Sequence, residues 1–362
     1  MDVALLGMKG NFNNKLGQGT QRYMHELWKN ISMIKHEGIN VRKLELGFGK
    51  SDLARKVSFT FSVAMQYMGG YDIVHVLHPI MFNPPLRKRT TKIITTINEF
   101  IVLEEDNPYR KAEAISAAKK GFKLQNIARN SIGSVIRNQM LESDYLLTIS
   151  DKTRREAIRL GVERDRIFVV NLGLDERFTT PLNKKKRNTV FKVGFIGGFN
   201  IRKNAIFAIR AFRHIPNKDL VFELWGKPML EYDKCVEAAS GDRRIQFKGF
   251  APEDKLVDVY EGFDVFVYPS LYAGLELEIL EAQARGIPVI IYEGGNITKE
   301  ARYYFAARDE KHMAEIIMDL KENGFDEAKR LKAMKYAQSF TWRKTAENTV
   351  EVYRDIMGRS EQ

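Results

Sequence analysis

Short runs of β-branched and aromatic residues alternate with longer segments of helical periodicity along almost the whole chain. This alternation is typical of α/β structure, in which each helix connects two parallel strands. In the first half, the strands predicted from these runs cover residues 3–7, 40–44, 72–77, 92–97, 144–149 and 166–170. In the second half they cover residues 190–197, 220–225, 245–248, 264–268 and 288–292.

A polar segment separates the two series of strands. Residues 179–188, TTPLNKKKRN, contain a proline and four consecutive basic residues, which favours an interdomain linker, although the basic run could also form a binding patch. We therefore predict two Rossmann-like, doubly wound domains that face each other across a cleft, residues 1–180 and 188–340. The amphipathic pattern of residues 341–357 predicts a last helix, and we expect residues 341–362 to pack back onto the first domain.

The most informative segment is DVFVYPSLYAGLELEILEAQARGIP, which starts at Asp264 and ends at Pro288. It reads as a buried strand, a glycine turn and a helix whose first turns carry Glu276, Glu278 and Glu281. Such a junction directs free backbone N–H groups toward one point, which suits a phosphate or a sugar hydroxyl. A carboxylate slightly further along the helix could hold a ribose diol.

A second glycine turn, GFIGGFN, lies at residues 194–200 and is followed by Arg202 and Lys203. The glycine spacing is not that of a dinucleotide-binding fingerprint. Two cations at the start of a helix can neutralise a diphosphate, although ordinary surface charge is the alternative. Gly17 and Gly19 form a further glycine loop after the first strand, where the backbone could approach a ligand.

Composition narrows the class of protein. The 362-residue chain is 44% apolar and 29% charged, contains no membrane-spanning run, and has a single cysteine, Cys235, which excludes an internal disulfide. We expect a cytoplasmic protein. His75 and His78 have an H-x-x-H spacing without a third ligand nearby, and no D-x-D motif occurs, so we expect no metal and no cofactor.

The net charge of +12 is concentrated in the first half, where residues 1–180 contain 28 Lys and Arg against 19 Asp and Glu. Residues 109–140 interleave basic and apolar side chains, which is typical of a helix on an anionic membrane surface. The alternative is a domain helix with a solvated basic face. We expect no nucleic-acid partner, because no aromatic platform or reader motif accompanies the charge.

Taken together, the motifs resemble those of a GT-B-fold glycosyltransferase of the family 4 type, which is retaining and uses nucleotide-diphosphate sugars. The resemblance covers nearly the whole chain and is strongest over residues 192–288, in KVGFIGGFNIRKN, LVFELWGKP, IQFKGFAPEDKL, DVFVYPSL and LEILEAQARGIPV. In the first half it is carried by GQGTQRYMHEL, YDIVHVLHP, KIITTINEF and DYLLTISDKTRREAIRLGVERDRIFVVNLGLDERF.

The resemblance implies metal-free transfer of a hexose from a UDP- or GDP-sugar to a glycan, lipid-linked or protein-linked acceptor. Lys203 matches the family's diphosphate-binding lysine, while the family's arginine falls at Gly198, so Arg202 is expected to replace it. Glu281 matches the glutamate that holds the ribose, but the glutamate that contacts the sugar falls at Ala273, and Glu276 or Glu278 could replace it. Asn98 stands where the family often has histidine.

The remaining donor-binding positions implied by the resemblance are loop residues: Gly17, Gly19, Gly198, Phe250, Ala251, Gly274 and Leu275. Ala273 and Asn98 leave open a non-catalytic sugar-nucleotide-binding or membrane-associated protein on a degenerate GT-B scaffold. A nucleotide-sugar epimerase on the same architecture is a second alternative, against which the small number of histidines speaks.

Overall fold

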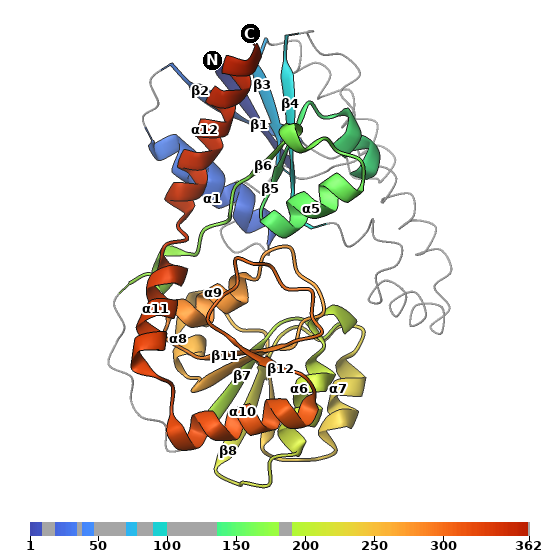
Figure 1. Ribbon diagram of the computed structural model, residues 1–362, viewed down its shortest axis with the longest axis vertical. Coiled ribbons are helices and arrows are strands. Elements are labelled where there is room, and N and C mark those ends of the chain that lie inside the picture. The colour runs from blue at the N-terminus through green and yellow to red at the C-terminus, as the bar shows by residue number, and fades with distance from the viewer. Residues whose placement is uncertain are drawn as a thin grey trace. The chain divides into compact units, whose positions relative to one another are not determined.

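The computed structural model describes residues 1–8, 19–34, 38–46, 70–77, 90–99, 136–180 and 190–360. The chain divides into two compact units, of which the first contains the described residues up to Gly173 together with the segment that begins at Trp342. The second unit covers Leu174–Thr341. Figure 1 labels most of the helices and strands of the two units.

The first unit is built on a six-stranded parallel sheet of order β2-β1-β3-β4-β5-β6. Its strands are β1 (Asp2–Met8), β2 (Asn40–Leu46), β3 (Ile73–Val76), β4 (Lys92–Ile97), β5 (Tyr145–Thr148) and β6 (Ile167–Val169). They coincide with the strands predicted from the apolar runs, because a parallel sheet buries both faces of its strands.

The helices of the first unit include α1 (Thr20–Met33), α5 (Asp151–Arg159) and α12 (Trp342–Ser360). A capping box starts α5, since the side chain of Ser150 accepts from the backbone N–H of Thr153 and the Thr153 side chain accepts from that of Ser150. Helix α12 lies against α1 although the two are at opposite ends of the chain (Figure 1).

The second unit has a six-stranded parallel sheet of order β12-β11-β10-β7-β8-β9. The strands are β7 (Phe191–Ile196), β8 (Leu220–Trp225), β9 (Ile245–Gly249), β10 (Val265–Tyr268), β11 (Val289–Tyr292) and β12 (Phe305–Ala307). The helices are α6 (Ala205–Arg213), α7 (Tyr232–Ala239), α8 (Leu256–Glu261), α9 (Leu277–Ala284), α10 (Glu310–Asn323) and α11 (Glu327–Gln338).

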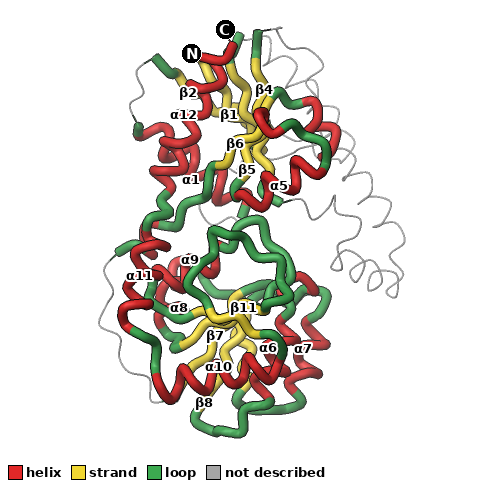
Figure 2. The backbone as a smooth tube through the Cα atoms, viewed as in Figure 1, coloured by secondary structure: helices red, strands yellow, loops and turns green. Residues whose placement is uncertain are grey.

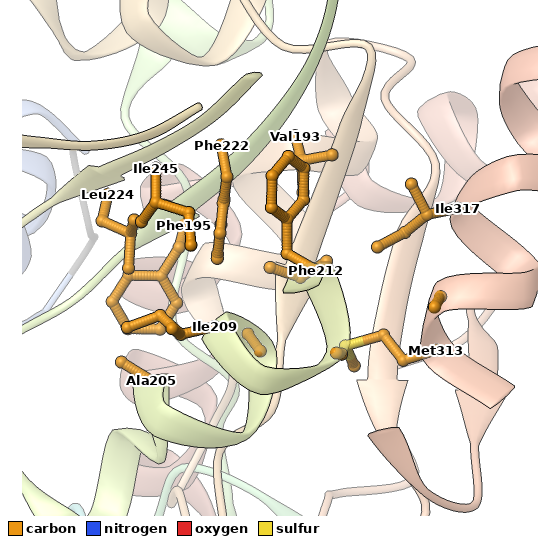
Figure 3. Close-up of a cluster of buried hydrophobic side chains, with 14 of the residues drawn as sticks. Val193, Phe195, Ala205, Ile209, Phe212, Phe222, Leu224, Ile245, Met313 and Ile317 are labelled. Carbon is orange, nitrogen blue, oxygen red and sulfur yellow. The ribbon is translucent and has the colours of Figure 1, made fainter. Parts of the chain in front are cut away.

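Helices cover both faces of this second sheet: in Figure 2, α8, α9 and α11 lie on one side of its strands and α6 and α7 on the other. Helices α6, α7 and α10 contribute to one hydrophobic core, and α8, α9 and α11 contribute to another. Figure 3 shows the first core, in which Ile209 and Phe212 of α6 lie beneath Phe222 of β8. Both faces of the sheet are therefore buried, and a ligand is expected to bind at the carboxyl ends of its strands.

Two details differ from the sequence-based prediction. The units divide after Gly173 rather than near residue 180, because Leu174 and Phe178 are buried in the core of the second unit. Strand β12 (Phe305–Ala307) was not predicted from the sequence. Of the predicted linker, residues 181–188 lie outside the described residues.

Candidate functional site

The candidate site lies in the second unit, where strands β7 and β10 are neighbours at the centre of the sheet. From β7 the chain passes through α6 to β8, and from β10 it passes through α9 to β11 on the opposite side of the strand order. The two connections therefore leave the sheet in opposite directions. In open parallel sheets, a crevice for ligands forms at this kind of switch point.

The loop after β7 is fixed by short-range hydrogen bonds. Asn200 accepts from the backbone N–H of Lys203 (3.0 Å) and so caps the 3₁₀ turn Ile201–Lys203. Asn204 then adopts a left-handed conformation (φ 51°) before α6 begins. The Arg202 carbonyl accepts from Leu271 N–H (2.8 Å), which joins this loop to the loop that follows β10.

Lys203 directs its ammonium group toward residues of β10 and α9. Its Nζ forms an ion pair and hydrogen bond with Glu278 Oε1, donates to the Tyr268 hydroxyl (3.4 Å) and lies 4.8 Å from the centre of the Tyr268 ring. Lys203 is only 6% exposed. A lysine buried this deeply needs such partners to remain charged.

These charges shift the titration of the surrounding groups. Burial raises the pKa of Glu278, but the Lys203 ammonium and its hydrogen bond, with a smaller effect of Arg202, outweigh burial and hold that pKa below its usual value. Burial and the negative charges of Glu278 and Glu276 raise the pKa of Tyr268 well above 10. Glu278 is therefore ionised and Tyr268 neutral near pH 7.

The other two carboxylates of the α9 segment have different partners. Glu276, which is almost fully buried, accepts from Thr298 N–H (3.0 Å) and from the Thr298 hydroxyl (2.5 Å). Glu281 accepts from the Tyr260 hydroxyl (2.8 Å). Thr298 thus fixes the loop that precedes α9, while Tyr260 orients Glu281; the roles of Glu276 and Glu281 toward a donor stay predictions.

The other predicted positions of the second unit lie in turns and loops. Phe250 is 51% exposed and has the Lys227 ammonium 4.7 Å from its ring centre, whereas the side chain of Ala251 is buried in the core. A Cβ on Gly198 would meet Met229 Sδ at 2.5 Å, so the side chain of Met229 lies over this glycine. Gly274 and Leu275 are buried just before α9.

Three predicted positions belong to the first part of the chain. Gly19 precedes α1 with φ +42°, and Asn98 directly follows β4. Both lie after strands of the first unit, Gly19 after β1 and Asn98 after β4. Gly17 lies outside the described residues, as do His78 and residues 109–135 of the predicted basic helix, so membrane contact through that helix stays a prediction.

The sequence analysis missed two side chains at the site. Tyr268 is the last residue of β10, and its position at the end of a central strand was the available signal. Tyr260 lies on α8 and reaches Glu281 across 21 positions of sequence, for which no sequence signal exists. Glu278 was an alternative carboxylate for the sugar, whereas here it binds Lys203.

Other groups with candidate chemistry are structural. His75 is fully buried, with Nδ1 2.7 Å from the Tyr353 hydroxyl and Nε2 2.7 Å from Thr96 Oγ1. Burial raises the pKa of the Cys235 thiol to about 12, which keeps it protonated and unreactive.

Within the described ranges, no group of three or more His, Cys, Asp or Glu side chains could hold a metal ion. None of the described helices is both long and apolar enough to cross a bilayer.

Comparison with known proteins connects this geometry to a family. The sequence model of the family Glycosyl transferases group 1 matches residues 190–323, which include β7, the 3₁₀ turn and α9. O-antigen chain mannosyltransferase B of Escherichia coli is 25% identical over 230 residues, which are 58% of this chain and 60% of that protein. The alignments span about three fifths of the length of the curated relatives that this chain matches.

Solved structures are similar over almost the full length. Sucrose-phosphate synthase from Thermosynechococcus elongatus has a TM-score of 0.76 at 17% identity and covers 99% of both chains. Anabaena HepE, solved in complex with UDP-glucose, has a TM-score of 0.66 at 13% identity and covers 98% of this chain and 100% of its own. This protein therefore has the GT-B fold, and its residues 190–323, which match the glycosyl transferases group 1 family, contain the candidate site at the switch point of the second sheet.

Proposed function

We propose that this protein is a glycosyltransferase that transfers a hexose from a UDP- or GDP-sugar to a saccharide or lipid-linked acceptor. The observation that carries the proposal is the position of Lys203 and Arg202 beside α9 at the switch point of the second sheet. A nucleotide-sugar places its diphosphate at such a crevice. The match to glycosyl transferases group 1 over the same segment supports this assignment.

In the proposed reaction, the bond between the sugar C1 and the diphosphate oxygen breaks as the acceptor hydroxyl forms a bond to C1. Lys203 and Arg202 stabilise the negative charge that grows on the leaving diphosphate. In many enzymes, electrostatic stabilisation of this kind makes the largest single contribution to the rate enhancement. These two cations would do so without a metal ion. Glu281, held by Tyr260, would bind the ribose of the donor, and Phe250 would contact the base.

We further propose that the anomeric configuration is retained. In front-face attack, the departing phosphate accepts the proton of the acceptor hydroxyl, so no protein base is needed. Asn98, which cannot accept a proton at neutral pH, is compatible with this route as a hydrogen-bond donor to a sugar hydroxyl.

The first experiment identifies the nucleotide and the sugar of the donor. The UDP-glucose bound to HepE favours a UDP-sugar, while the name of the Escherichia coli relative indicates transfer of mannose. Titration with UDP- and GDP-linked glucose, galactose, mannose and N-acetylglucosamine, followed by measurement of donor hydrolysis and transfer, separates these options. Saturable binding without any turnover would instead support a non-catalytic sugar-nucleotide-binding protein, and recovery of an epimerised donor would support an epimerase.

Replacing Lys203 with alanine tests the assigned site. We expect Lys203→Ala to lower turnover of the preferred donor by about 10²- to 10³-fold, because one stabilising charge on the leaving group is lost. Lys234→Ala is the matched control, since Lys234 on α7 is 57% exposed and pairs with Glu231, the residue that precedes this helix. Equal turnover by the Lys203 variant and the control would remove diphosphate stabilisation by Lys203 from the mechanism.

A further inference from the structure

The Lys203 ammonium is neutralised by a carboxylate of the protein itself. Its Nζ is bonded to Glu278 Oε1, and the side chain of Glu278 is 26% exposed whereas that of Lys203 is 7% exposed. Glu278 lies in the first turn of α9, and Lys203 ends the 3₁₀ turn after β7. The ion pair thus bridges the two connections that form the switch point.

A donor diphosphate and the Glu278 carboxylate would bind the same group, the Lys203 ammonium. Both present negatively charged oxygens that bind an ammonium group, and two anions that share one cation repel each other. The carboxylate of Glu276 is bonded to Thr298 and that of Glu281 to Tyr260, whereas the carboxylate of Glu278 is bonded to Lys203. Because the Glu278 side chain is partly exposed, it can turn toward solvent when Lys203 binds another anion.

We infer that Glu278 is an internal counter-ion that occupies the place of the donor diphosphate at Lys203 and thereby weakens donor binding and speeds release of the nucleoside diphosphate. This inference rests on the proposed function and deepens it. When the donor is absent, the Glu278 carboxylate holds the buried ammonium in position. When a diphosphate enters, its oxygens replace the carboxylate at Nζ, and the Glu278 side chain turns to solvent.

The arrangement has a functional consequence at the end of each reaction cycle. A site built only from cations would retain the nucleoside diphosphate, which carries more negative charge than the donor. A carboxylate that returns to Lys203 competes with this product and favours its dissociation. Glu278 is thus an affinity-setting residue rather than a catalytic one.

The test compares binding of UDP, GDP and inorganic pyrophosphate to the full chain and to Glu278→Gln by titration calorimetry at fixed ionic strength. Glutamine retains the size of the side chain and can still accept from Lys203, so we expect an unchanged fold. Removal of the charge should tighten binding of the preferred diphosphate by about tenfold and slow its dissociation correspondingly. Glu278→Ala, which removes both the charge and the contact, provides a second variant with the same expected direction.

Two controls separate this effect from a general change in charge. Glu310→Gln, at the start of α10, removes one negative charge from an ion pair with Arg210 (3.7 Å) and should leave affinity within about twofold. In a Lys203→Ala background, the gain caused by Glu278→Gln should fall to less than about threefold, since the two effects act through one contact.

Several outcomes would overturn the inference: equal or weaker diphosphate binding by both Glu278 variants, an equal gain in Glu310→Gln, an undiminished gain without Lys203, or no diphosphate binding by any variant. Failure of the proposed function has a different signature. In that case no sugar nucleotide would be turned over, although Glu278→Gln still bound pyrophosphate more tightly than the unaltered chain.

Discussion

At the residue scale, the hydroxyl of Tyr260 shows how a functional side chain is oriented by the core. The Tyr260 ring is fully buried and packs edge-on against Phe178 at 5.5 Å and beside Phe266 at 5.4 Å between ring centres. These aromatic contacts fix the ring, so that its hydroxyl can donate to Glu281. The carboxylate proposed to bind the ribose is thus positioned by a residue of α8 that does not itself need to touch the donor.

Tyr260→Phe removes this hydroxyl and retains the ring. We expect a loss of stability of about 1 kcal/mol and a rise of about three- to tenfold in the KM for the donor with little change in kcat, because Glu281 loses its orienting donor. Steady-state kinetics with varied donor measures both constants. Tyr232→Phe on α7 is the matched control; the same KM in both variants would show that Tyr260 acts through packing alone.

At the element scale, the turns after β7, β8 and β9 are packed backbone against backbone. A Cβ on Gly226 would lie 1.8 Å from the carbonyl oxygen of Gly197, and Gly226 N–H donates to the Gly249 carbonyl (2.7 Å). Gly197 N–H in turn donates to the Trp225 carbonyl (2.9 Å). The position of the loop that carries Lys203 therefore depends on a glycine at the end of the neighbouring strand.

Gly226→Ala should force the Gly197 turn away from β8. We expect a loss of about 1–3 kcal/mol in the free energy of unfolding and weaker diphosphate binding, as is typical when atoms are added to a closely packed position. Gly358→Ala in α12 is the control, because a Cβ there meets nothing within 4 Å and alanine favours a helix. Urea denaturation of both variants measures the difference, and equal stabilities would contradict the close approach.

At the scale of the whole molecule, the first unit is completed by the end of the chain. Trp342, Ala346, Val350, Tyr353 and Ile356 of α12 are buried, although more than half of the sequence separates them from β3. Tyr353 lies against His75, which is also bonded to Thr96, and Thr96 lies 2.9 Å from the Tyr23 hydroxyl. This buried network joins β3, β4, α1 and α12.

The network makes the stability of the first unit depend on pH. Burial lowers the pKa of His75 from 6.5 to about 3, so below about pH 6.5 the unfolded chain binds a proton that the folded chain excludes. Stability contributed by neutral His75 is therefore lost as pH falls from about 6.5 toward 3, at about 1.4 kcal/mol per pH unit, or about 2 kcal/mol between pH 7 and pH 5.

The measurement is urea denaturation in a Trp225→Phe background, where Trp28 and Trp342 report on the first unit. A His75→Gln variant lacks the titrating ring and is the matched control, because other groups also change with pH. The loss of stability from pH 7 to pH 5 should be about 2 kcal/mol greater in the chain that retains His75 than in this variant. Parallel pH profiles would show that His75 remains able to bind a proton in the folded state.

The sequence by itself determined most of the strands and the two chain segments that form the candidate site. Strands such as Lys92–Ile97 and Val265–Tyr268 were predicted because β-branched and aromatic runs express local backbone preference and burial. The glycine turn before Arg202 and Lys203, and the helix that carries Glu281, were predicted because turn and capping chemistry acts over a few residues.

The tertiary structure decided which side chains meet. Lys203 and Glu278 are 75 positions apart, and His75 and Tyr353 are 278 apart, so local pattern could not pair them. Likewise, Leu174 and Phe178 joined the second core because apolar surface there remained to be buried, although a polar linker signal lay further along the chain. Local sterics specify where a strand or turn forms, whereas contacts between distant segments depend on how the whole sheet is ordered.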